Sequence, residues 1–113
     1  MKRTKYLLAV VAILPLLVAC HTRRSDVMGD WVTSNDSVPS GFNLGYSGIA
    51  ASIGNPETQY LSWSMRGERI YLHGKRYRQG SAHDFIDTLV ITSFSPTTMT
   101  VWVKDKKINY VRP

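Results

Sequence analysis

The sequence predicts an all-β protein: a small antiparallel meander that closes into a barrel of about eight strands, preceded by a signal-peptide helix. From residue 29 onward, apolar residues recur with a period of two rather than 3.6, which is typical of strands with one buried face. β-branched and aromatic residues dominate this stretch. Turn-forming residues recur at short intervals between the apolar runs. An antiparallel sheet of about eight strands removes its exposed edge strands most simply by closing into a barrel.

The first 19 residues predict a secretory signal peptide. Three of the first five residues are basic, and an apolar run from Tyr6 to Ala19 follows. This run is shorter than the roughly 20 residues that a membrane-spanning helix needs. It ends at Leu17-Val18-Ala19-Cys20, which resembles a bacterial lipobox. Cys20 is therefore expected to carry lipid as the first residue of the mature chain.

The mature chain would be a one-domain lipoprotein of the cell envelope, because removing 19 residues from 113 leaves 94. We expect residues 20–28 to form a short, solvated, lipidated tether and residues 29–113 to form the barrel. Cys20 is the only cysteine, so the chain can form no intramolecular disulfide. The expected location is the outer membrane, facing the periplasm by default, with surface exposure left open.

Charge argues against nucleic acid as a partner. The whole chain carries a formal charge of +6, but three of its 14 basic residues lie in the signal peptide, which leaves +3. A small charge spread along an exported chain predicts no nucleic-acid binding. The membrane is the partner that the predicted lipid anchor implies.

Three candidate strands open the domain, at residues 29–33, 41–46 and 47–53, with loops at 35–40 and 54–57. The alternating apolar residues of the second and third are Phe42, Leu44 and Tyr46, and then Ile49, Ala51 and Ile53. Three hairpins follow, registered by placing apolar residues opposite one another. The first turns at Gly67-Glu68, which suits a type II′ turn, and its pairs are Met65 with Ile70 and Trp63 with Leu72.

The second hairpin is expected to turn at residues 95–97 and the third at Asp105-Lys106. The inward pairs of the second are Ser93 with Met99, Ile91 with Val101 and Leu89 with Val103, and its outward pairs include Val90 with Trp102 and Phe94 with Thr98. The third pairs Val103 with Ile108 and Val101 with Tyr110. Both hairpins therefore predict that Val101 and Val103 point inward.

Four stretches resemble the small lipocalin-like lipoproteins of Bacteroidetes-type bacteria. They are Gly29-Asp30-Trp31, Gly41-Phe42-x-Leu44, Gly48 to Ile53, and Tyr60-x-x-Trp63. The resemblance implies that Trp31 plugs the closed end of the barrel and that Arg112, on the last strand, stacks on it. The chain has no helix after the barrel and is short for a full lipocalin, so a roomy ligand cup is not implied.

Two sets of residues are candidate sites. Trp63, Tyr110 and Phe42 either fill the core or bind a small apolar or amphipathic ligand in the barrel mouth. The second set is an interaction face, on which an envelope protein could dock; its members are Val90, Phe94, Trp102, Lys75, Arg76 and Arg78. The three basic residues lie in a segment, 74–80, that reads either as a solvated loop or as a site for an anionic group.

No metal, cofactor or catalytic site is predicted. His73, His83, Asp84 and Asp87 are the only clustered ligand types, and their spacing matches no established metal site. No Gly-x-Ser-x-Gly motif is present, and the only thiol is expected to be acylated. We therefore expect a non-enzymatic envelope protein that binds a small ligand, with an inhibitor or assembly factor as the alternative.

Overall fold

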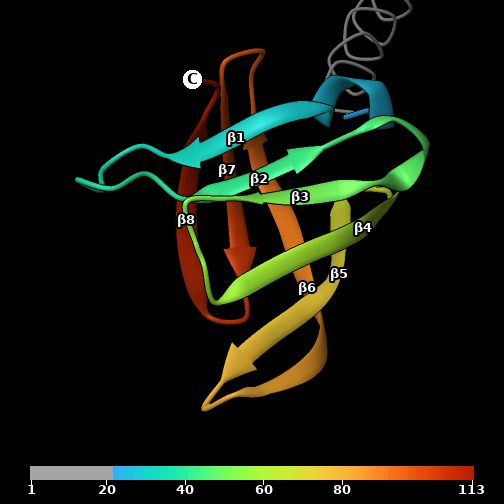
Figure 1. Cartoon of the computed structure of the whole chain (residues 1–113). Helices are drawn as coiled ribbons and strands as arrows, with labels where there is room; N and C mark the ends of the chain where they lie inside the picture. The colour runs from blue at the N-terminus through green and yellow to red at the C-terminus, as the bar shows by residue number, and fades with distance from the viewer. Residues whose placement is uncertain (1–21) are drawn as a thin grey trace, which may run out of the picture.

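The computed structural model describes residues 22–113, and Figure 1 shows its strands wound into one barrel. The elements in chain order are η1 (Arg24–Val27), β1 (Gly29–Thr33), β2 (Gly41–Leu44), η2 (Tyr46–Gly48), β3 (Ala50–Ile53), β4 (Thr58–Arg66), β5 (Arg69–Arg78), β6 (Ser81–Phe94), β7 (Thr98–Val103) and β8 (Lys106–Val111). The predicted signal peptide and Cys20 lie outside the described residues. Within residues 22–113, no helix is long and apolar enough to cross a membrane.

The eight strands form one antiparallel sheet in the order β3-β2-β1-β8-β7-β6-β5-β4. β1 pairs with β8, so the first and last strands of the chain are neighbours. The edge strands β3 and β4 also meet, through an isolated bridge between Ile49, just before β3, and Ser62, and through a 2.8 Å hydrogen bond from the Tyr60 amide to Ser52 Oγ. The sheet therefore curls into the nearly closed barrel that the sequence predicts.

The barrel has two different ends. η1, η2 and the turns after β4 and β6 lie at one end, which we call the closed end. The loops after β1 and β3 and the turn after β7 lie at the other end, the mouth. The β5–β6 hairpin projects past the rest of the barrel on the mouth side (Figure 1).

One apolar core fills the barrel. Its largest fully buried side chains are Trp31, Phe42, Leu44, Ile70, Leu72, Met99, Val27 and Val101. The predicted first hairpin is confirmed, because Trp63 lies opposite Leu72 and Met65 opposite Ile70. Gly67 has a φ of +58°, as the first position of a type II′ turn requires.

A bulge corrects the predicted β6–β7 register. Val90 pairs with Trp102 as expected, but the register shifts between Ile91 and Ser93, so that Phe94 lies opposite Met99 rather than Thr98. The extra residue turns Phe94 toward the core, where its ring meets Trp31 edge-on at 6.0 Å. Phe94 is therefore not part of an exposed interaction face.

The predicted β7–β8 register is wrong by two residues. The turn falls at Lys104-Asp105 rather than Asp105-Lys106, so Val101 pairs with Ile108 and Val103 with Lys106. Lys104 adopts a φ of +59°, which lets the chain reverse one residue earlier. A shift of two residues keeps each side chain on its face, and Val101 remains fully buried as predicted.

The segments 74–80 and 47–53 also differ from expectation. β5 continues through Arg78 and turns only at Gln79-Gly80, both with positive φ, so the predicted basic loop is mostly strand. The strand expected from residue 47 begins at Ala50, because η2 intervenes and Ser47 takes a φ of 59°. Ala50 consequently faces the core, and Ile49 is 65% exposed.

The segment expected to be a solvated tether packs against the barrel from Thr22 onward. η1 lies within it, Val27 is fully buried and Thr22 is 8% exposed. The Thr22 amide donates to Glu68 Oε1 at 3.0 Å. The polar sequence of this segment does not predict the packing. The hydrogen bonds that hold the segment run to groups 46 to 86 residues away in the chain.

Candidate ligand-binding site

The closed end is sealed around Trp31. Trp31 is fully buried, and its indole Nε1 donates to the carbonyl of Val27 in η1 at 2.8 Å. The Arg112 guanidinium stacks on the indole at 4.1 Å, which confirms the predicted cation–π contact. A Cβ at Gly29 would lie only 2.7 Å from Arg112 Nη1, so glycine at the start of Gly-x-Trp leaves room for the arginine.

Arg112 also ties three chain segments together. It donates from Nη2 to the Asp26 carbonyl at 2.6 Å, from Nη1 to the Met28 carbonyl at 2.7 Å, and from Nε to the Pro96 carbonyl at 2.6 Å. Carbonyls left unpaired at the end of η1 are thereby satisfied by a charged donor. These contacts close this end to a ligand.

Trp63 lies at the closed end as well. It is 3% exposed, its Nε1 donates to the Gly45 carbonyl at 2.9 Å, and the Arg24 guanidinium lies 3.9 Å from its ring. Trp63 does not line the pocket at the mouth, so its role is to fill the core, which is one of the two roles that the sequence allows.

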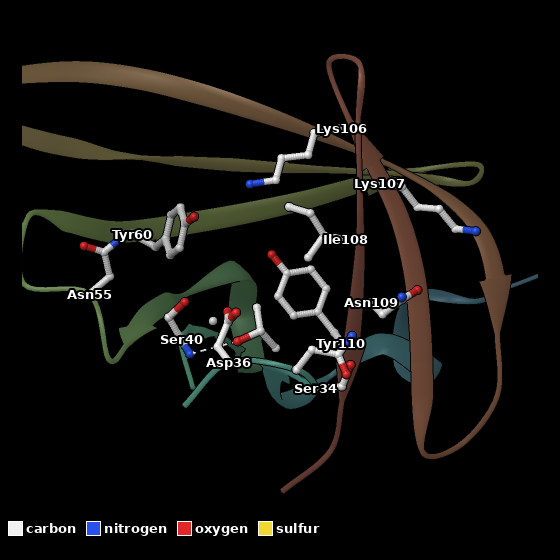
Figure 2. A pocket seen from close by; sticks show the side chains of 13 residues that line it. Ser34, Asp36, Ser40, Asn55, Tyr60, Lys106, Lys107, Ile108, Asn109 and Tyr110 are labelled. Carbon is white, nitrogen blue, oxygen red and sulfur yellow. Dashed lines mark hydrogen bonds between the residues drawn. The ribbon is translucent and has the colours of Figure 1, made fainter. Parts of the chain in front are cut away.

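A pocket of about 370 Å³ opens at the mouth (Figure 2). Polar side chains from the loops after β1 and β3 and from the start of β8 dominate its lining. The lining residues are Thr33, Ser34, Asn35, Asp36, Ser40, Gly41, Asn55, Tyr60, Lys106, Lys107, Ile108, Asn109 and Tyr110. This volume lies in the lower part of the range of about 300–1,000 Å³ that small-molecule sites occupy.

Two tyrosines form the aromatic side of this mouth pocket. Figure 2 shows Tyr60 and Tyr110 turned toward the same space, with Lys106 and Ile108 on one side of it. Phe42 is 1% exposed and packs edge-on against both, with ring centroids 4.9 Å from Tyr110 and 6.1 Å from Tyr60. Of the three predicted ligand residues, Tyr110 therefore lines the pocket and Phe42 supports it from the core.

An ion pair lies next to Tyr60 inside the barrel. Arg76 Nη2 is 3.4 Å from Asp87 Oδ2, and the guanidinium stacks 4.2 Å above the Phe85 ring. The Phe85 ring in turn meets Tyr60 at 5.8 Å. Arg76 is consequently only half-exposed and engaged within the barrel, so it does not belong to an outer interaction face.

The environment raises the pKa of both pocket tyrosines. Burial is the main cause that raises the pKa of Tyr60 above its usual 10.0; Asp87 raises it further and Arg76 opposes the rise. Burial also raises the pKa of Tyr110 well above its usual range, with contributions from Tyr60 and Asp87. A tyrosine of ordinary pKa is already protonated at neutral pH, so each hydroxyl can donate and accept a hydrogen bond there, and burial extends this range into alkaline solution.

Four of the six residues of the predicted interaction face lie on the outside of the barrel, since Phe94 and Arg76 turn inward. Trp102 is 40% exposed and Val90 is half-buried beside it on the outer surface of β6 and β7. Lys75 and Arg78 are exposed on β5, with Lys75 3.9 Å from Asp84. Among residues 22–113, no three His, Cys, Asp or Glu side chains gather into a metal site.

Tyr60 is the aromatic pocket residue that was not predicted from the sequence. Tyr60 and Trp63 are three residues apart, which would place them on opposite faces of a regular strand. The β4 register shifts between Tyr60 and Ser62, and this bulge turns both aromatic rings inward. The Tyr60-x-x-Trp63 spacing places both rings inward only when a bulge lies between the two residues.

A family profile described as lipocalin-like matches residues 23–113, which is most of the chain. The chain belongs to the lipocalin-like family. A crystal structure of a lipocalin-like protein from Bacteroides thetaiotaomicron VPI-5482 has the same fold, with a TM-score of 0.70 and 23% identity over 77% of this chain and 96% of that one. No curated protein matches the chain at a significant level. Membership of the lipocalin-like family thus agrees with the resemblance seen in the sequence.

Proposed function

We propose that this lipocalin-like protein binds one small amphipathic ligand in the mouth pocket and does not convert it. The observation that carries the proposal is that Tyr60 and Tyr110 both line one pocket of about 370 Å³. Their rings offer an apolar surface, while the Asp36, Ser40 and Asn55 side chains and the two phenols offer hydrogen bonds. This mixed lining favours an amphipathic ligand over a purely apolar one.

Native mass spectrometry of the mature protein from its own envelope tests the proposal. We expect a bound small molecule at one per chain, and we expect it to be lost in Ile108→Trp, which fills the pocket. Thr92→Trp adds the same ring at an exposed position outside the pocket and should retain the molecule. A protein that arrives empty and binds no amphipathic probe would overturn the proposal.

We further propose that Cys20 carries a lipid and anchors the barrel in the cell envelope, with the periplasm-facing outer membrane as the default location. The support is the lipobox-like sequence that ends at Cys20. Two or more acyl chains give stable anchoring, whereas one gives only marginal binding. The intact mass of the isolated protein should show a chain that begins at acylated Cys20, and Cys20→Ala should leave the protein unprocessed.

An envelope interaction protein remains the second candidate, on the smaller surface formed by Trp102 and Val90. Trp102 is one of the exposed large apolar side chains of the described structure. Trp102→Ala discriminates the two functions. It should abolish capture of a protein partner if this surface docks one, and it should leave the small molecule in the mouth pocket undisturbed.

A further inference from the structure

The packing of Thr22 against the barrel limits where the proposed lipid anchor at Cys20 can lie. Thr22 is buried at the closed end, and its amide bonds to Glu68 at 3.0 Å. Only one residue separates Thr22 from Cys20, so their Cα atoms lie within about 7 Å of each other. A free tether over residues 20–28 would have reached about 30 Å. The packed segment therefore brings the proposed anchor directly to the closed end.

We propose that the closed end is a docking surface for anionic phospholipid headgroups, so that the barrel rests on the membrane with its mouth pointing away. This inference rests on the proposed acylation of Cys20. It adds an orientation to that proposal: the mouth pocket opens toward the aqueous side, one strand length from the bilayer. β7 spans six residues between the two ends, which is about 20 Å.

The charges at the closed end suit an anionic surface. Four exposed arginines lie there: Arg23 and Arg24 in or beside η1, and Arg66 and Arg69 on either side of the β4–β5 turn. None of the four forms an ion pair with a described carboxylate, since the two ion pairs among residues 22–113 use other residues. Basic residues held near a membrane surface attract anionic lipids.

The carboxylates at this end are already engaged by other groups. Glu68 accepts the Thr22 amide, and Asp26 Oδ2 accepts the Arg23 amide at 2.9 Å. Asp30 Oδ1 accepts from the Asn43 side chain at 2.7 Å. These hydrogen bonds leave the three carboxylates charged, but with Arg112 the closed end holds five arginines against three acids, so its net charge is +2.

The same end carries exposed apolar groups suited to the membrane interface. Tyr46, the first residue of η2, is 84% exposed, and Ile49, which follows η2, is 65% exposed. A surface hollow lies between η1 and η2, lined by Arg23, Arg24, Ser25, Met28, Tyr46 and Ser47. An amphipathic tyrosine beside two arginines fits the level of phosphate headgroups in a bilayer.

Site-specific fluorescence quenching in vesicles tests the orientation with the full acylated protein. Ser25→Cys and Ser37→Cys place a matched thiol label on exposed serines at the closed end and at the mouth. The native thiol does not compete for the label, because Cys20 is acylated. In phosphatidylglycerol vesicles with headgroup nitroxides, we expect the Ser25 label to be quenched several-fold more than the Ser37 label. Equal quenching at the two positions, or none at either, would overturn the orientation.

Charge substitutions at opposite ends test the headgroup contact. Arg23→Gln with Arg69→Gln should at least halve the quenching of the Ser25 label in phosphatidylglycerol vesicles. Arg78→Gln with Lys104→Gln removes the same charge from exposed positions on the mouth side, outside the mouth pocket, and should leave it unchanged. Equal effects of the two pairs, or equal quenching in phosphatidylcholine vesicles, would contradict the contact. The intact mass shows independently whether Cys20 is acylated, so a failed anchor is distinguished from a failed orientation.

Discussion

At the residue scale, Arg112 does the most to define this barrel. One guanidinium covers Trp31 and bonds to three carbonyls from two distant segments of the chain. The stacking on Trp31 was predictable from the family resemblance, because both residues have fixed places in it. The three hydrogen bonds were not, since they depend on η1, whose sequence reads as a linker.

Arg112→Ala should destabilise the protein by about 2–4 kcal/mol, since charged hydrogen bonds contribute about 1.5–3 kcal/mol each and are not additive. It should also release η1, exposing the Trp31 indole to solvent. Chemical denaturation with tryptophan fluorescence measures both effects. Arg66→Ala, at an exposed arginine without an ion pair among the described residues, serves as the control and should cost less than about 0.5 kcal/mol. An equal loss of unfolding free energy in the two variants would show that the Arg112 contacts do not stabilise the barrel.

The two mouth tyrosines predict that stability falls in alkaline solution. Folding raises the pKa values of Tyr60 and Tyr110 above the 10.0 of the unfolded chain. Their contribution is complete below pH 10 and is lost as pH rises from 10 toward the folded pKa values, because the unfolded state releases those protons first. The loss should approach about 1.4 kcal/mol per pH unit for each tyrosine.

Urea unfolding between pH 8 and pH 11 measures this slope. Tyr60→Phe and Tyr110→Phe are the matched variants, and each should flatten the curve above pH 10 because the phenol that titrates is gone. A tyrosine absorbance titration of the wild type in which every tyrosine ionises near 10.0 would refute the assignment.

At the element scale, the strands followed from the sequence, whereas bulges and tight turns did not. Alternating apolar residues located the β4–β5 hairpin and its pairs, and β1 begins and ends where expected. Phe94 follows the bulge in β6 and Tyr60 precedes the bulge in β4, and each bulge changes which residues share a face without any change in composition. The β7–β8 turn depends on a lysine with positive φ, a conformation that the sequence does not favour.

Lys104→Gly should stabilise the protein by about 0.5–1 kcal/mol, because a left-handed conformation costs a non-glycine residue about 1–2 kcal/mol and glycine also loses some entropy. Thermal unfolding measures the gain. Lys106→Gly places the same change in β8, where it should destabilise the barrel. A loss of stability in Lys104→Gly would mean that the turn adopts another conformation.

At the scale of the whole molecule, the barrel separates its two proposed tasks. Trp31, Trp63 and their stacked arginines seal the end from which the chain emerges, and the tyrosine pair sits at the other end. The sequence predicted the barrel and one of the two pocket tyrosines, Tyr110. It did not predict the polar lining, because Asp36, Ser40 and Asn55 come from loops whose path depends on the closed fold.

The central claim, that the mouth is a binding site for an amphipathic ligand, is tested most directly by amide chemical-shift mapping. The described barrel, residues 22–113, would be titrated with anilinonaphthalene sulfonate, which joins an aromatic surface to one anionic group. We predict saturable shifts at Ser40, Tyr60, Ile108 and Tyr110, and none at the closed end. Shifts that do not saturate, or that gather around Val90 and Trp102 on the outer surface, would contradict the claim.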